Sequence, residues 1–169
     1  MSAPTLGLNA VQRARVRRRI KAAAYLTLRH APVVHYTQGG SRWQGIASHL
    51  RAFRGQFPHY ADCSSFATWC HWDASLRYKP RDYVNGENWA GGYTGTMADH
   101  GARVMDYQHL KVGDLALYGP GPTHSHVAVV VESGPIDRVK VISHGSEGGP
   151  YLLGVRYRGD LAQIRRYLK

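Results

Sequence analysis

The stretch Tyr60-Ala-Asp-Cys-Ser-Ser-Phe-Ala-Thr-Trp-Cys70 places a cysteine, Cys63, in what we predict to be the first turn of a helix. Asp62 can cap that helix, because its carboxylate can accept hydrogen bonds from the free backbone N–H groups of the first turn. The same N–H groups and the helix dipole favour negative charge, so we expect a stabilised thiolate at Cys63. The alternative is that Cys63 is a small buried hydrophobic residue and Asp62 only a cap.

The second cysteine of the stretch is expected to have another role. Cys70 follows Cys63 on the same predicted helix, about 10 Å further along the axis. A disulfide requires Cα atoms within roughly 7 Å of one another. We therefore predict two free thiols, with Cys70 in the core.

Size and charge limit the function classes. The chain has 169 residues, which predicts a single domain, and a net charge of +11, which predicts an anionic partner. Nucleic acid, anionic lipid and anionic cell-wall polymer all fit, but no nucleic-acid-binding motif is present. No apolar run reaches the roughly 20 residues of a membrane span. We expect no membrane insertion, no secretion signal and a monomer.

The order of the predicted elements indicates an α+β fold. A basic helix over residues 10–29, with a solvated face or a face that docks on an anionic polymer, follows a loose arm and ends before Pro32. A second helix begins at Cys63, and residues 76–112 form a long irregular insert. Five strands of an antiparallel sheet follow, at residues 114–118, 126–132, 138–144, 152–157 and 163–168. We expect the arm and the basic helix at residues 1–32 to precede the core of the same domain at 33–169.

Two histidines become candidate partners of Cys63 if residues 133–137 form a symmetric hairpin loop. With the register centred on Pro135, His126 faces His144 across the two strands. Directly opposed residues have Cβ atoms about 4.5–5.5 Å apart. A cysteine nucleophile needs a base, and the base needs a group that orients it. Each histidine alone is also compatible with a purely structural role.

A zinc site is a competing interpretation of the same region. His124 and His126 lie on one face of a strand, and His144 would lie opposite them. Three histidines and a water suit catalytic zinc. Because His124 follows a loop rich in glycine and proline, we instead expect it at the rim of a cleft, and we predict no metal and no cofactor.

Five motifs resemble those of the NlpC-like cell-wall cysteine peptidases and, more distantly, the CHAP amidase/peptidases. They are Tyr36-Thr-Gln-Gly-Gly40, Asp62-Cys-Ser-Ser-Phe66, Gly113-Asp-Leu-Ala-Leu-Tyr118, His126-Val-Ala-Val-Val-Val-Glu132 and Val141-Ile-Ser-His144. The resemblance implies a papain-like fold, in which a nucleophile helix packs on a five- to six-stranded antiparallel sheet. It also implies a thioester mechanism, in which Cys63 is the nucleophile, His126 the base, His144 the orienting residue and Tyr36 an oxyanion donor.

The implied substrate is the stem peptide of peptidoglycan, cut for example between D-glutamate and diaminopimelate. We expect substrate contacts from Asp62, Ser64, Trp89 and His124, with the insert 76–112 as one wall of the groove or as a surface excursion. Compactness and positive charge resemble the catalytic domain of a phage or prophage lysin, made in the host cytoplasm and acting at the cell wall. Amidase activity, zinc hydrolysis and nucleic-acid binding are the alternatives.

Overall fold

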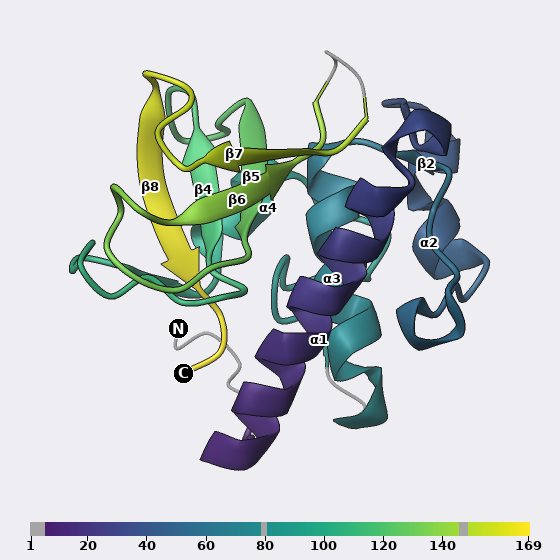
Figure 1. Ribbon diagram of the computed structural model, residues 1–169, viewed down its shortest axis with the longest axis horizontal. Helices are drawn as coiled ribbons and strands as arrows, with labels where there is room; N and C mark the ends of the chain where they lie inside the picture. Colours follow the sequence, from purple (N-terminus) through teal and green to yellow (C-terminus); the bar gives the residue numbers. More distant parts are fainter. Residues whose placement is uncertain (1–5, 79–80, 146–148) are drawn as a thin grey trace.

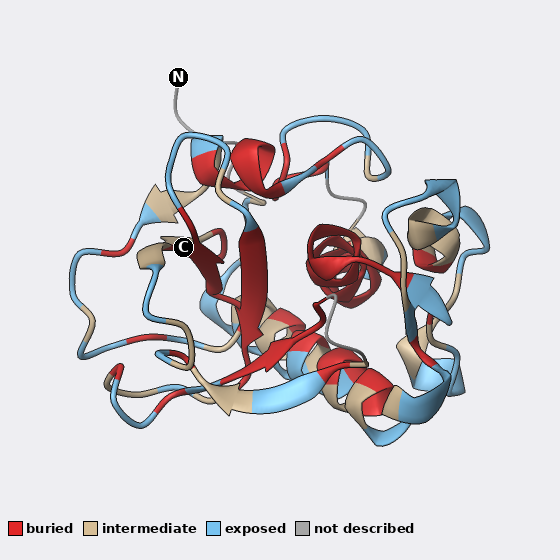
Figure 2. Ribbon diagram, turned by 90° about the horizontal axis from the view of Figure 1, so that it is seen from above, coloured by how far each residue is buried: buried red, intermediate tan, exposed pale blue. Residues whose placement is uncertain are grey.

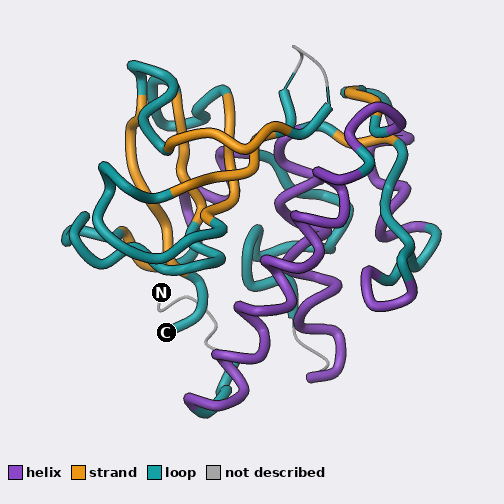
Figure 3. The backbone as a smooth tube through the Cα atoms, viewed as in Figure 1, coloured by secondary structure: helices purple, strands orange, loops and turns teal. Residues whose placement is uncertain are grey.

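The computed structural model describes residues 6–78, 81–145 and 149–169, and it confirms the predicted α+β class. A six-stranded antiparallel sheet lies on one side and the two long helices on the other (Figure 1). The tube drawing makes the separation plain, with strands and helices in two adjoining layers (Figure 3). None of the helices in the described ranges has the length and apolar character needed to cross a bilayer.

The first long helix, α1 (Ala10–Arg29), has the predicted bounds. Asn9 begins it with a capping box, in which Asn9 and Gln12 each accept the other's backbone N–H. The predicted apolar stripe is buried; it consists of Val16, Ile20, Ala23, Ala24 and Thr27. Two of the basic residues are used inside the fold, because Arg13 donates to the carbonyl of Leu8 and Arg17 to that of Val112.

The second long helix, α3 (Cys63–Ser75), lies at the centre of the molecule, and every one of its residues is buried (Figure 2). Asp62 caps it as predicted, accepting the backbone N–H of Ser65 at 2.7 Å. The helix packs against α1, against the strand that begins at His126 and against the short helix α2 (Gln44–Ala47). Because the helix is enclosed on all sides, its polar side chains are buried too and are hydrogen-bonded within the fold: Ser64, Thr68, His71 and Ser75.

The large sheet has the strand order β3-β8-β4-β5-β6-β7. Its members are β3 (Ala102–Arg103), β4 (Leu115–Tyr118), β5 (His126–Val130), β6 (Lys140–Ser143), β7 (Tyr151–Gly154) and β8 (Leu161–Arg166). Strands β4 to β7 form the expected meander, whereas β8 returns to the far side of β4. One face of β5 packs toward α3 through Val127 and Val129, and the other face packs into a second core through Ala128 and Val130.

The predicted register of the hairpin between β5 and β6 is wrong by one residue. Ala128 lies opposite Ser143, and Val130 lies opposite Val141. The connection is asymmetric because a turn closes only its second half, where Val139 N donates to Pro135 O at 3.1 Å. A one-residue slip moves alternate side chains to the opposite face of a sheet. His126 therefore shares a face of the sheet with Ser143, the direct partner of Ala128, and His144 lies on the opposite face.

The remaining segments connect these layers. Strands β1 (His35–Tyr36) and β2 (Tyr60–Ala61) form a small parallel pair that leads into α3. The insert holds one short helix, α4 (Thr94–Asp99), close to the predicted position. Short 3-10 turns lie at Ala31–Val33, Gly40–Trp43, Ala52–Arg54 and Leu76–Tyr78.

Candidate active site

Cys63 is the first residue of α3 and is only 7% exposed. The backbone N–H groups of Cys63 itself, of Ser64 and of Val127 point at its sulfur. Since Val127 directly follows His126 at the start of β5, the helix terminus and this strand meet at the thiol. Packing of the nucleophile helix on the sheet, which the sequence made plausible, is thus present in the structure.

The Cys63 thiol is not ionised in the way we expected from its position at the helix terminus. Burial, followed by the nearby Asp62 carboxylate, raises its pKa to about 11. The three N–H groups act in the opposite direction but are outweighed. A buried thiol loses the hydration that a thiolate needs. At neutral pH the resting side chain is therefore a thiol, and a base must take its proton.

Arg42 is a component of the site that sequence reasoning missed. Its Nη1 lies 2.6 Å from Asp62 Oδ2, while Asp62 Oδ1 accepts the hydroxyl of Ser64 at 3.0 Å. The Asp62 side chain is 5% exposed, so Arg42 balances a buried negative charge beside Cys63. Nothing in the sequence singles out this arginine among many, because it lies in a segment without periodicity.

His126 begins β5, and its Nε2 is hydrogen-bonded to Ser143 Oγ at 2.7 Å. Ser143 in turn is 3.0 Å from the hydroxyl of Tyr157. The imidazole also lies beside Tyr118, with ring centroids 5.8 Å apart. Ser143 thus makes the contact with His126 that we expected of His144. The reason is the observed register, which puts Ser143 and not His144 on the same face of the sheet as His126.

His144 lies on the other face, next to the start of α3. Its Nε2 is 3.0 Å from the carbonyl oxygen of Ala61, two residues before Cys63. Its ring packs edge-on against Tyr36 and Phe66. Tyr36 is itself paired with Ala61 across β1 and β2, so the long spacing in sequence does not separate it from the nucleophile segment. The Tyr36 hydroxyl accepts a hydrogen bond from Gln38 at 3.0 Å.

The three histidines of the zinc alternative do not converge. His124 adopts a left-handed backbone conformation in the loop before β5, and its ring nitrogens contact Gly119 O at 2.9 Å and Gln163 Nε2 at 2.8 Å. His126 and His144 have the separate partners described above. Within residues 6–78, 81–145 and 149–169, no group of three metal-binding side chains is close enough to hold an ion.

The insert is anchored firmly to α3. Buried Asn85 donates to Thr68 Oγ1 at 3.2 Å and accepts from Thr96 Oγ1 at 3.0 Å. Trp89 stands edge-on to Tyr83 and lines a pocket of about 790 Å³, whose other lining residues include Arg81, Asp82 and His100. Tyr83 reaches His71, which lies two turns along α3 from Cys63. The structure thus places Trp89 by the middle of the helix and not at the end that carries Cys63.

Comparison with known proteins agrees with this architecture. Residues 53–145, more than half of the chain and including Cys63, His126 and His144, match the family model of the CHAP domain. No curated protein matches the chain in sequence.

Solved structures resemble the fold at low sequence identity. The peptidoglycan hydrolase RipB from Mycobacterium tuberculosis has a TM-score of 0.63 at 18% identity, over 96% of this chain and 69% of that one. NlpC2 from Trichomonas vaginalis has a TM-score of 0.60 at 14% identity, over 98% of this chain but only 50% of that one. These similarities confirm the predicted NlpC-like, papain-like fold.

Proposed function

The chain belongs to the CHAP domain family, and on that basis we propose that it is a peptidoglycan hydrolase that uses Cys63 as its nucleophile. The observation that carries the proposal is the meeting of the α3 terminus with the start of β5. There the sulfur is within reach of the Val127 N–H, one residue from His126. RipB, which shares the fold, is described as a peptidoglycan hydrolase.

In the proposed mechanism His126 takes the proton of the Cys63 thiol as the sulfur attacks a substrate carbonyl carbon. Ser143 holds Nε2 of the imidazole, so we assign the proton transfer to Nδ1. The pKa of the thiol, about 11, favours transfer that accompanies attack over a thiolate present beforehand. The same nitrogen then protonates the leaving amine, and water hydrolyses the thioester.

The tetrahedral intermediate places negative charge on the former carbonyl oxygen. The free N–H groups at the start of α3 supply donors for it, and such preorganised donors contribute several kcal/mol to stabilising a transition state. We also assign a donor role to Tyr36, which is paired with Ala61, two residues before Cys63. Asp62 and Ser64 are committed to the helix cap and to each other, so we assign them to shaping the site more than to substrate contact.

We propose stem peptides of the cell wall as the substrate, with the bond between D-glutamate and diaminopimelate as the example to test first. The test is mass spectrometry of purified peptidoglycan digested by the wild type and by Cys63→Ala. Fragments cut within the stem peptide, present only with the wild type, would support an endopeptidase. Release of whole stem peptides from the glycan would instead identify an amidase, the alternative that membership of the CHAP family favours.

Inhibition separates this mechanism from metal chemistry. A cysteine hydrolase is inactivated by thiol alkylation and retains activity in a chelator, and a zinc hydrolase behaves in the opposite way. Digestion products that are identical for the wild type and for Cys63→Ala would contradict the proposal. Lysis of bacteria on behalf of a phage is a further proposal, which addition of the protein to intact cells would test.

A further inference from the structure

A groove of about 530 Å³ lies at the end of α3 opposite Cys63. Its lining residues come from α1, from the segment around the 3-10 turn Ala52–Arg54 and from the residues that follow α3. We call it the arginine groove, because four arginines line it together with three other residues: Arg19, Arg51, Arg54 and Arg77 with His49, Phe53 and Leu76. A helix of this length places it about 18 Å from the nucleophile.

The positive charge of the arginine groove is largely uncompensated. Asp73 is the acid beneath it, and it is engaged by Arg51, with Nε 3.0 Å from Oδ1. Arg51 also donates from Nη2 to the backbone carbonyl of Asp73 at 3.2 Å. Of the ion pairs in the described part of the chain, none involves Arg19, Arg54 or Arg77. Three guanidinium groups therefore line the groove without an ion-pair partner among the described residues.

The aromatic ring of Phe53 contacts two of the arginines that line the groove. Phe53 is 74% exposed, and the guanidinium carbons of Arg51 and Arg54 lie 5.5 and 5.4 Å from the centre of its ring. Arg51 also lies 5.4 Å from the ring centre of Trp72. Cation–π contacts of this kind restrict the arginine side chains. Less conformational freedom is then lost when an anion binds.

We propose that the arginine groove binds a phosphodiester polymer of the cell envelope and so holds the enzyme close to its substrate. The planar guanidinium group matches phosphate oxygens in pairs, which favours phosphate over a diffuse negative field. A repeating polymer also offers successive phosphates to arginines that come from three different segments. The proposed location of this ligand rests on the proposed function, but the binding itself does not depend on catalysis.

The test is titration of fluorescently labelled full-length protein with sodium polyphosphate at several salt concentrations. The double variant Arg54→Gln/Arg77→Gln should bind at least tenfold more weakly than the wild type. The slope of log affinity against log salt should become shallower by roughly 0.7 for each phosphate that the variant no longer neutralises. Phe53→Ala, which leaves the charge unchanged, should also weaken binding because it removes the ring contact of Arg54.

The matched control is Arg138→Gln/Arg156→Gln. It removes the same charge from exposed positions around the β6–β7 side, where Arg156 lies 3.4 Å from Asp137. This control should bind within about twofold of the wild type by the screening of distant charges. Equal weakening in both double variants would show a general charge effect and overturn the proposal. Binding of the wild type to anionic phospholipid vesicles without binding to polyphosphate would overturn it as well.

Two measurements distinguish binding in the arginine groove from the proposed hydrolase activity. Cys63→Ala should bind polyphosphate as the wild type does, and Arg54→Gln/Arg77→Gln should cleave a short soluble stem peptide at the wild-type rate. If neither the wild type nor any variant cleaves the peptide, the binding comparison still tests whether the arginine groove binds polyphosphate. If the double variant unfolds at a lower temperature than the wild type, the single variants Arg54→Gln and Phe53→Ala are compared with the wild type in its place.

Discussion

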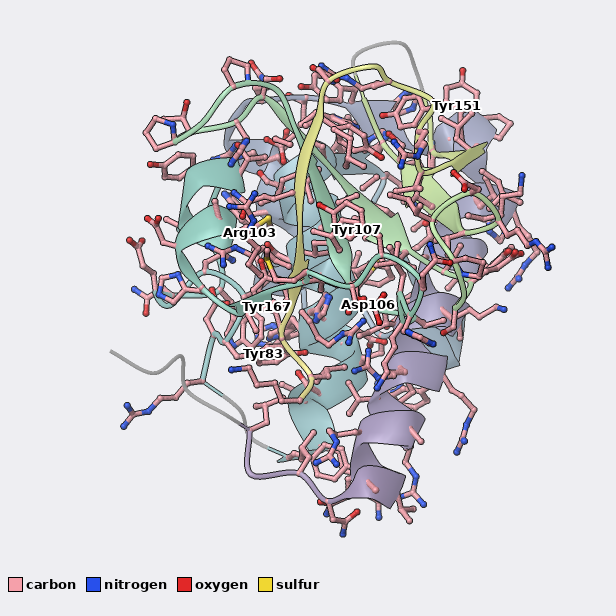
Figure 4. All side chains as sticks on the ribbon, turned by 90° about the vertical axis from the view of Figure 1, so that its left-hand side faces the viewer. Tyr83, Arg103, Asp106, Tyr107, Tyr151 and Tyr167 are labelled. Carbon is pink, nitrogen blue, oxygen red and sulfur yellow. The ribbon has the colours of Figure 1, made fainter. Side chains whose placement is uncertain are left out.

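His71 makes the stability of the fold sensitive to acid. Its ring is fully buried on α3 and lies between two tyrosines, with centroids 5.5 Å from Tyr83 and 5.8 Å from Tyr167. Figure 4 labels both tyrosines, which come from the insert and from the end of β8 and lie close together. Burial, assisted by the positive charge of Arg17, lowers the pKa of His71 to about 3. The folded protein therefore keeps this imidazole neutral.

The sign and size of the effect follow from proton linkage. Between pH 6.5 and pH 3 the unfolded chain binds a proton at this position and the folded protein does not, so stability falls as the pH falls. Each pH unit in this range is worth about 1.4 kcal/mol. From pH 7 to pH 5 the contribution of His71 should reduce the free energy of unfolding by about 2 kcal/mol.

The perturbation is His71→Phe, which removes the titration and retains an aromatic ring. The Tyr83 hydroxyl keeps an acceptor, since it also lies 3.2 Å from the backbone carbonyl of residue 71. Urea unfolding of both proteins at several pH values gives the difference in free energy. Taking the difference removes the contributions of Asp73 and Asp82, whose pKa values burial raises.

We expect the advantage of the wild type over His71→Phe to shrink by about 2 kcal/mol between pH 7 and pH 5. A second variant, His71→Gln, should show the same slope whatever its stability at pH 7. A difference that stays constant with pH would refute the reasoning, because it would mean that His71 titrates alike in the folded and unfolded chains.

Three further substitutions probe the site and its support. Asp62→Asn keeps a capping side chain but removes a negative charge, so the pKa of Cys63 should fall. The rate at which iodoacetamide alkylates Cys63 at pH 8 should then rise, and an unchanged rate would contradict the effect given to the Asp62 charge. Ser143→Ala should lower kcat about tenfold with little change in KM, because the base loses its orienting partner, and equal loss in both constants would argue against this. Gly45→Ala places a Cβ 2.5 Å from Cδ1 of Trp69 and should reduce stability by about 1–3 kcal/mol, measured by urea unfolding.

Much of the fold follows from local signals in the sequence. Asn9 and Asp62 are caps whose chemistry is readable without tertiary information, and both long helices begin where these residues predict. The strands of the meander are equally visible, because apolar runs alternate with turn residues. The return of β8 to the side of β4 is not, because no local pattern specifies which edge of a sheet a final strand joins.

The partner of His126 and the charge state of Cys63 depend on tertiary contacts that local sequence patterns do not specify. The predicted pairing of His126 with His144 required a symmetric hairpin loop. The turn at Pro135–Val139 makes the loop asymmetric and shifts the pairing of β5 with β6 by one residue. That single shift replaced His144 by Ser143 as the partner of His126. The charge state of Cys63 was also beyond the sequence, since a helix terminus favours a thiolate only when burial does not outweigh it.

The complete enclosure of α3 has a consequence for how this scaffold can diversify. A helix with no exposed residue tolerates few substitutions, so Cys63 has a fixed position relative to β5. New substrate preferences must then arise in the segments that surround its start, above all residues 37–59. A library for redirecting the enzyme should leave residues 62–75 untouched and concentrate its variation in those loops.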